Sequence, residues 1–149
     1  MSKRSLPIPN SNPMQEKFIN YIMQDGKKSV ARKIFFDAFE EIRKRGNKDP
    51  EKIFEKALKN ITPTLEVRPK RIGGAIYQIP LEVKPSRQVM LSLRWLREGS
   101  RNRKGAPMYK KLADELLDAS NETGHAFKKK EDTTKMAQAN KAFAHLARY

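Results

Sequence analysis

Apolar side chains recur every three or four residues between about residues 14 and 61, which is the spacing of helices that bury one face. The pattern predicts helices over residues 13–25, 30–45 and 50–61. Proline at the first helical position indicates where the first and third helices begin. Gly26 and Gly46 follow the first and second helices as carboxyl-terminal caps, and Pro63 stops the third.

Between residues 65 and 83 the period falls to two, and apolar and polar side chains alternate on either side of Gly73 and Gly74. This pattern predicts two strands joined by a tight turn. Pro69 and Pro80 lack a backbone N–H, so neither strand is expected inside a larger sheet, and no third strand is predicted. We expect a two-stranded hairpin that is mobile in the free protein. It would project by about 26 Å, at ~3.3 Å per residue, if it stands away from the helices.

The helical period returns after Pro85 and predicts a fourth helix over about residues 86–100. A fifth helix begins at Pro107 and is closed by Gly124, and a sixth begins between Lys128 and Asp132 and runs to the carboxyl terminus. Residues 1–13 are expected to form a flexible, basic, proline-rich arm, and residues 14–149 a single domain. The fold class is mainly α, a bundle of about six helices with a protruding two-stranded β-hairpin between the third and fourth helices.

Net charge indicates the class of partner. The chain carries 32 Lys and Arg against 17 Asp and Glu, a formal charge of +15. Residues 64–111 hold 12 basic and 3 acidic residues, so +9 of this excess lies in that stretch. A polyanion is the expected partner. No apolar run approaches the roughly 18 residues of a membrane-spanning helix, and the absence of cysteine excludes disulfides and thiolate zinc sites.

Enzyme chemistry has little support in this sequence. Neither His125 nor His145 is paired by any motif with a nucleophile or a metal ligand. The Asp25-Gly26-Lys27-Lys28-Ser29 segment resembles the end of a phosphate-binding loop, but that loop needs a glycine where Tyr21 stands. We therefore predict no catalytic residue, no metal and no cofactor.

Four arginines of the fourth predicted helix share one face. On a helical wheel Arg87, Arg94, Arg97 and Arg101 fall within a roughly 80° arc, with Glu98 as the nearby counter-charge. Their mutual repulsion would be relieved by phosphate, which the guanidinium fork suits. A solvated charged face is the alternative interpretation, and we retain it for the lysines of the second and third helices.

Longer blocks resemble a known family. Over roughly residues 14–146 the chain resembles the small-subunit ribosomal protein seven family, of the bacterial or organellar type. The matching blocks, in order, are residues 25–29, 64–68, 71–83, 93–96, 112–116, 128–132 and 136–145.

The resemblance implies a structural constituent of the small ribosomal subunit, a primary rRNA-binding protein of the large 3′ domain that nucleates head assembly. It implies a position near the mRNA exit and the tRNA exit site, beside head and platform ribosomal proteins, with no membrane and no cofactor. Its location would be the ribosome of a bacterial cytoplasm, with a plastid as the alternative. The rival hypothesis is a general helical DNA- or RNA-binding architectural protein. Because the chain stops at Tyr149, we expect a short carboxyl-terminal reach toward neighbouring proteins.

Charge and resemblance together give two sets of candidate residues. The expected rRNA contacts are Lys3, Arg4, Lys27, Lys28, Arg68, Lys70, Arg71, Lys84, Arg87, Arg94, Arg97, Arg101, Arg103, Lys104, Lys110, Lys111, Lys128, Lys129 and Lys130. The residues expected near mRNA or tRNA are Gly73, Gly74, Ala75, Tyr77, Lys135, Lys141 and Arg148.

Overall fold

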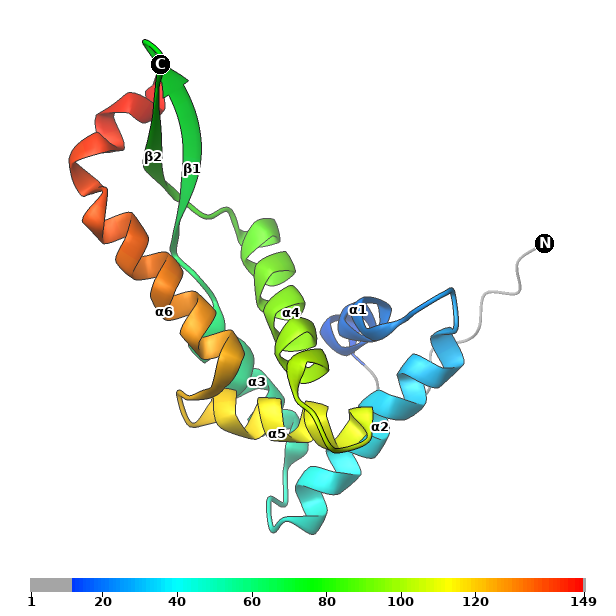
Figure 1. Ribbon diagram of the computed structural model, residues 1–149. Helices are drawn as coiled ribbons and strands as arrows, with labels where there is room; N and C mark the ends of the chain where they lie inside the picture. Colours follow the sequence, from blue (N-terminus) through cyan, green and yellow to red (C-terminus); the bar gives the residue numbers. More distant parts are fainter. Residues whose placement is uncertain (1–11, 149) are drawn as a thin grey trace.

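The computed structural model describes residues 12–148, and Figure 1 shows a helical body from which a hairpin projects. In chain order these residues form α1 (Pro13–Ile22), α2 (Lys28–Lys44), α3 (Pro50–Ile61), β1 (Leu65–Ile72), β2 (Ala75–Glu82), α4 (Pro85–Asn102), α5 (Met108–Ser120), α6 (Gly124–Ala139) and the 3₁₀ helix η1 (Lys141–Arg148). The predicted fold class is confirmed, with the hairpin between α3 and α4. None of the helices described combines the length and apolar character needed to cross a lipid bilayer.

The first and third helices begin where their capping residues predict. The Asn12 side chain accepts a hydrogen bond from the backbone N–H of Gln15 at 2.8 Å, and Asp49 accepts one from Lys52 at 3.3 Å. Each cap is followed by proline at the first helical turn. The second helix begins at Lys28, two residues before the predicted start.

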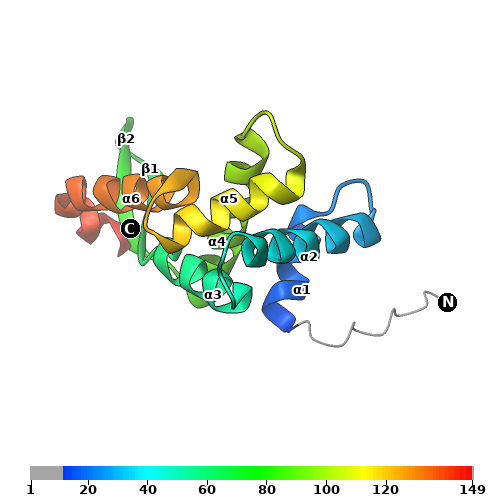
Figure 2. The ribbon, with the colours of Figure 1, turned by 90° about the horizontal axis from the view of Figure 1, so that it is seen from below.

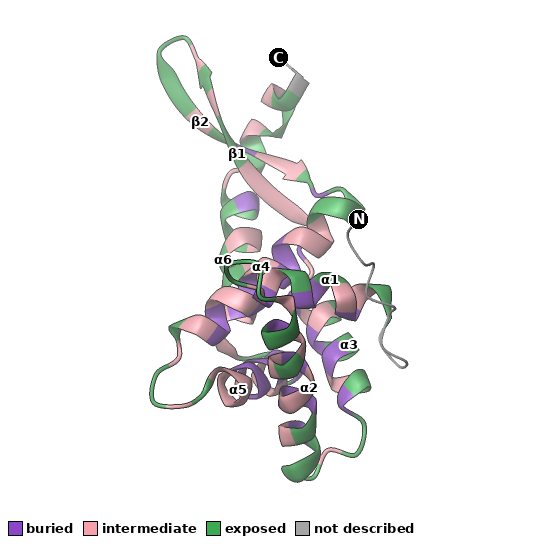
Figure 3. Cartoon of the chain, turned by 90° about the vertical axis from the view of Figure 1, so that its right-hand side faces the viewer, coloured by how far each residue is buried: buried purple, intermediate pink, exposed green. Residues whose placement is uncertain are grey.

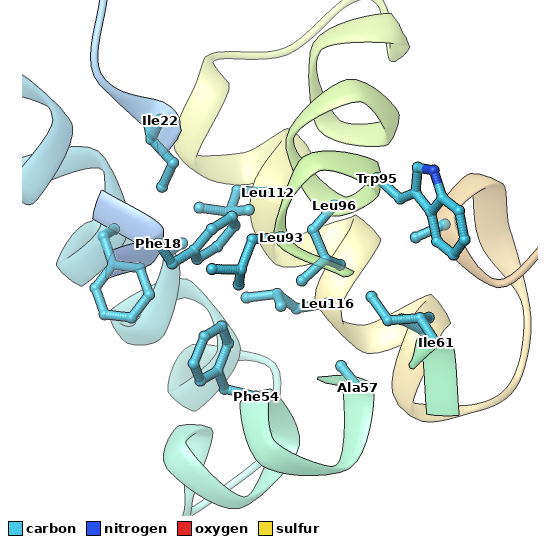
Figure 4. Close-up of a cluster of buried hydrophobic side chains, with 14 of the residues drawn as sticks. Phe18, Ile22, Phe54, Ala57, Ile61, Leu93, Trp95, Leu96, Leu112 and Leu116 are labelled. Carbon is cyan, nitrogen blue, oxygen red and sulfur yellow. The ribbon is translucent and has the colours of Figure 1, made fainter. Parts of the chain in front are cut away.

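An aromatic cluster joins α1, α2 and α3 at the centre of the core. The Phe18 and Phe54 rings stack with 5.6 Å between centroids, and Phe35 meets both rings edge-on. Leucines from α4 and α5, among them Leu96 and Leu116, close the cluster (Figure 4). Full burial of a side chain of this size contributes roughly 1.5–3 kcal/mol, so this contact fixes the body on which the hairpin stands.

The hairpin has the predicted glycine turn. Gly73 and Gly74 both have positive φ, at 57° and 85°, as a two-residue turn of type I′ requires. The strands pair antiparallel from Leu65 opposite Glu82 to Ile72 opposite Ala75.

Both strand prolines occupy positions that cost the ladder nothing. Val83 N–H donates to the Thr64 carbonyl at 3.0 Å, so hydrogen-bonded pairs alternate with non-bonded pairs from that point. Pro69 lies opposite Gln78 and Pro80 opposite Val67, and both pairs fall on the non-bonded positions. The missing N–H of each proline would have pointed outward, away from the partner strand.

The hairpin does not stand free of the helices. α6 runs beside it, and η1 packs against β2, with the Tyr77 and Phe143 ring centroids 5.2 Å apart. Ile79 is only 2% exposed as a result. Figure 3 shows that buried residues otherwise gather in the body, while the hairpin tip and the carboxyl-terminal segment are largely exposed.

Three predictions in the carboxyl-terminal third are wrong: the end of the fifth helix and both ends of the sixth, which begins at Gly124 and not between Lys128 and Asp132. Gly124 does not close the fifth helix: α5 ends at Ser120, Glu122 takes the left-handed conformation, and Gly124 begins α6. The sixth helix does not run to the terminus, because both the backbone N–H and the side-chain amide of Asn140 donate to the Met136 carbonyl. These two hydrogen bonds cap the end of α6, and the chain continues as η1.

Candidate nucleic-acid interface

Two arginines of the predicted α4 arc hold α1 in place. Arg97 Nη1 donates to the Tyr21 carbonyl at 3.4 Å, and Arg101 Nη2 donates to the Ile22 carbonyl at 3.2 Å. The Arg97 guanidinium also lies 5.7 Å from the Tyr21 ring centroid. These carbonyls end α1, where the helix dipole favours cations, so both arginines cap a helix whatever else they bind.

The same two arginines lie close together, and no carboxylate among the described residues pairs with either of them. Burial lowers the pKa of the Arg101 guanidinium, and the neighbouring Arg97 charge lowers it further. Within residues 12–148, the ion pairs leave both without a carboxylate partner. A phosphate near this pair would offset their repulsion.

The other two arginines of the arc differ from each other. Arg87 Nε donates to Glu66 Oε1 at 2.6 Å, which ties the start of α4 to the base of the hairpin. Arg94 is half-buried and has no ion pair among the described residues. The four arginines therefore do not form a uniform surface for phosphate. Arg97 and Arg101 hold α1, Arg87 contacts the hairpin, and only the Arg94 side chain has no ion pair or hydrogen bond among the described residues.

Arg103 is held by carboxylates of the chain itself. Its Nε donates to Glu115 Oε2 at 3.0 Å, and Nη2 bonds Asp118. Glu115 is fully buried, and its Oε1 accepts the backbone N–H of Ala126 at 2.8 Å. Burial lowers the pKa of Arg103, but the hydrogen bonds that it donates to Asp118 and Glu115, together with their charges, outweigh burial and raise the pKa overall. This cluster fastens the α4–α5 loop and the start of α6 to α5.

The hairpin carries three cations that line a groove without an acidic side chain. Arg68 and Arg71 are exposed, and Lys70 Nζ donates to the Leu146 carbonyl at 3.2 Å. A groove of about 470 Å³ lies here, between the hairpin and the end of η1. Its lining is Arg68, Pro69, Lys70, Arg71, Ile79, Leu81 and Ala147. Three cations and no acidic side chain therefore surround one partly apolar groove.

A second groove adjoins the first at the base of the hairpin. Arg68, Lys84 and Arg87 contribute to its wall together with Glu66 and Glu82. The fold thus brings together hairpin and α4 residues that the sequence analysis had assigned to separate elements. The carboxylates make this groove less favourable for phosphate than the first.

The remaining candidates are distributed over other elements. At the α1–α2 turn Lys27 is exposed and Lys28 lies 3.8 Å from Glu16. In both Figure 1 and Figure 2 this turn and α6 lie on opposite sides of α4. Among the other candidate lysines, Lys110 and Lys111 are half-buried, and the exposed ones include Lys104, Lys128, Lys129, Lys135 and Lys141.

The other candidates differ in their surroundings. Lys130 pairs with Glu131 at 3.5 Å and lies over the Phe127 ring. Gly73, Gly74 and Ala75 are exposed at the hairpin tip. Lys3, Arg4 and the side chain of Arg148 lie outside the described part of the chain.

Sequence reasoning missed the partners of these cations. Glu66, the Tyr21 carbonyl, Phe143 and the Leu146 carbonyl each meet a candidate residue from a distant part of the chain. Contacts across 21 to 76 residues leave no local pattern in the sequence.

Comparisons with known proteins agree with one another. The family model described as ribosomal protein S7p/S5e matches residues 2–141. The small ribosomal subunit protein uS7 of Thermoanaerobacter sp. (strain X514) is 55% identical over 139 residues, which cover 93% of this chain and 88% of that protein. The proteins of the same name from Moorella thermoacetica and Thermotoga maritima are 56% and 54% identical, over 90% and 87% of this chain and 86% and 83% of their own lengths.

Proposed function

This chain belongs to the ribosomal protein S7p/S5e family of the small ribosomal subunit, and we propose that it is a primary binder of the large 3′ domain of the small-subunit rRNA. Binding there starts assembly of the subunit head. The family is structural and non-enzymatic, so the function lies in binding and shape rather than in turnover.

The observation that carries the proposal is the acid-free groove of the hairpin. Arg68, Lys70 and Arg71 surround it and no acidic side chain lines it, whereas in the body some carboxylates, such as Glu115 beside Arg103, bond the cations next to them. Phosphate oxygens supply the negative charge that this groove lacks. A protein that neutralises phosphates in this way binds folded RNA largely by shape, with little direct reading of sequence.

We place the hairpin tip and the carboxyl-terminal segment toward the mRNA exit and the exit-site tRNA, beside head and platform proteins of a bacterial-type ribosome. The exposed glycines of the turn and the exposed Lys135 and Lys141 support this orientation, because they leave the tip open to a partner. The α1–α2 turn and α4 then face the rRNA, where Lys27 and Arg94 are available.

The rival hypothesis, a general architectural protein that inserts an arginine helix into a nucleic-acid groove, fits the geometry less well. Arg97 and Arg101 face α1, and α4 packs between α1, α5 and α6. A recognition helix must present its side chains to the groove. Competition by duplex DNA separates the two hypotheses, since an architectural binder would lose rRNA to it at comparable concentrations.

The test is a chemical footprint of the purified protein on isolated small-subunit rRNA, with a structured RNA of equal length as competitor. We expect protection confined to the large 3′ domain and resistant to the competitor. Diffuse protection that the competitor removes would reduce the function to non-specific binding by a chain of charge +15.

A further inference from the structure

The segment that covers the hairpin is weakly held. η1 is eight residues of 3₁₀ helix, whereas runs beyond three or four residues are uncommon because their hydrogen bonds are poorly aligned. Only Phe143 and Leu146 of residues 141–147 are half-buried, and the others are exposed. Such a segment can leave its site at little cost to the core.

What η1 covers is a pair of side chains suited to RNA. Lys70 and Tyr77 lie directly opposite each other on β1 and β2, so their side chains share one face of the hairpin. The Phe143 ring lies 5.2 Å from the Tyr77 ring, tilted by 58°, and the Leu146 carbonyl accepts from Lys70 Nζ at 3.2 Å. An aromatic ring on Tyr77 beside an oxygen on Lys70 matches what one nucleotide offers, a base and a phosphate.

The surroundings favour a nucleotide over an apolar peptide. The groove continues past Lys70 to Arg68 and Arg71 and contains no acidic residue, and Ala147 of η1 forms part of its wall. Departure of η1 would widen this groove and free Lys70 beside Arg68 and Arg71, which are exposed already. The bases of an RNA duplex are paired and stacked within the duplex, so only a single strand can supply a free base to Tyr77.

We propose that η1 occupies, in the unbound protein, the place that one nucleotide of single-stranded RNA takes in the complex. The base replaces the Phe143 ring on Tyr77, and the phosphate replaces the Leu146 carbonyl on Lys70. The inference rests on the proposed function in that it requires an RNA partner. It adds that this partner is unpaired at the hairpin and that η1 competes with it.

The first experiment measures binding of a short labelled oligouridine to the full chain. Phe143→Ala should tighten binding by about two- to tenfold, since it removes a ring contact that competes with the base. Tyr77→Leu should weaken binding about fivefold or more, because the stacking surface is lost. Phe143→Ala added to Tyr77→Leu should then give no gain.

Two controls keep the result specific. His145→Ala changes an exposed ring of the same segment, whose Nδ1 lies 3.0 Å from the Ala142 carbonyl, and should leave the affinity unchanged. A duplex RNA of equal charge should bind wild type and Phe143→Ala equally. Unchanged or weaker oligouridine binding by Phe143→Ala would overturn the proposal.

A second measurement uses the wild-type chain and needs no variant. Nuclear Overhauser contacts between the Tyr77 and Phe143 rings should be present in the free protein and replaced by contacts from Tyr77 to base protons at saturation. Persistence of the Tyr77–Phe143 contacts in the saturated complex would contradict the exchange. Specific protection of rRNA in the footprint would survive that outcome, whereas loss of that protection would refute the proposed function itself.

Discussion

Gly99 shows how far one methyl group decides the packing around the buried carboxylate. A Cβ at this position would lie 2.6 Å from Glu115 Oε1, closer than any relaxed contact. Glu115 cannot retreat freely, because Arg103 and the Ala126 N–H hold its two oxygens. The absence of a side chain at residue 99 is therefore a packing requirement of this cluster.

We expect Gly99→Ala to lower the free energy of unfolding by about 1–3 kcal/mol, as overpacked sites do. Glycine to alanine inside a helix normally stabilises by roughly 0.5–1 kcal/mol, so the predicted sign is reversed. Urea denaturation followed by circular dichroism gives the value, with the exposed Lys56→Ala on α3 as the neutral control. A gain in stability would mean that the carboxylate moves without cost.

Substitution of Arg103 and of Arg94 by methionine should distinguish an arginine that stabilises the fold from one that is available to RNA. Arg103→Met should cost about 2–3 kcal/mol of stability, below the 3–5 kcal/mol of a fully buried pair because its side chain is 30% exposed. The loss would come from leaving the buried Glu115 carboxylate with the Ala126 N–H as its one remaining hydrogen-bond donor among the described residues. Arg94→Met, with no carboxylate partner among the described residues, should change stability by less than about 0.5 kcal/mol. Equal costs in thermal or urea unfolding would contradict this division.

At the scale of elements, local signals predicted what local interactions determine. Asn12 and Asp49 cap the helices that follow them, and the paired glycines form the turn, because each acts within three residues. The sequence does not predict the end of α6, because asparagine is a weaker signal for the end of a helix than glycine or proline, and Asn140 is the residue that ends it. Gly124 was assigned to the wrong helix because glycine with positive φ can precede a helix as well as follow one.

The hairpin should still be less stable locally than the body. We expect the hydrogen-bonded amides of Tyr77 and Ile79 to exchange with solvent faster than those in the middle of α2, since two strands alone are marginal in water. Removing residues 141–149 should speed exchange at Ile79 further, because η1 packs on β2. Hydrogen–deuterium exchange followed by NMR checks both statements. Exchange at Ile79 that is as slow as in α2, with or without η1, would contradict them.

At the scale of the whole molecule, the sequence predicted the sign of the charge and the class of partner but not the division of labour among the cations. The wheel placed Arg94 and Arg97 together, yet only α1, once packed, shows that Arg97 also caps a helix. Reversing Arg97 would therefore disturb the fold as well as binding. Arg68 and Arg71, which are exposed and outside the core, are the cleaner probes.

Arg68→Gln with Arg71→Gln should weaken rRNA binding and flatten its salt dependence by about 1.4–1.8 in the slope of log K against log salt, two phosphate contacts at roughly 0.7–0.9 each. Lys56→Gln with Lys59→Gln removes the same charge from exposed positions on α3 and serves as the matched control. Filter binding between 50 and 200 mM salt measures both. Equal slopes for the two double variants would mean that net charge alone governs affinity.

The outward position of both strand prolines affects how molecules of this protein meet one another. Pro69 interrupts the row of free N–H donors along the outer edge of β1, and Pro80 interrupts the row along β2. A strand of a second copy that pairs with either edge of the hairpin therefore lacks one hydrogen-bond donor there. The two prolines therefore oppose edge-to-edge pairing between the hairpins of two copies of this chain.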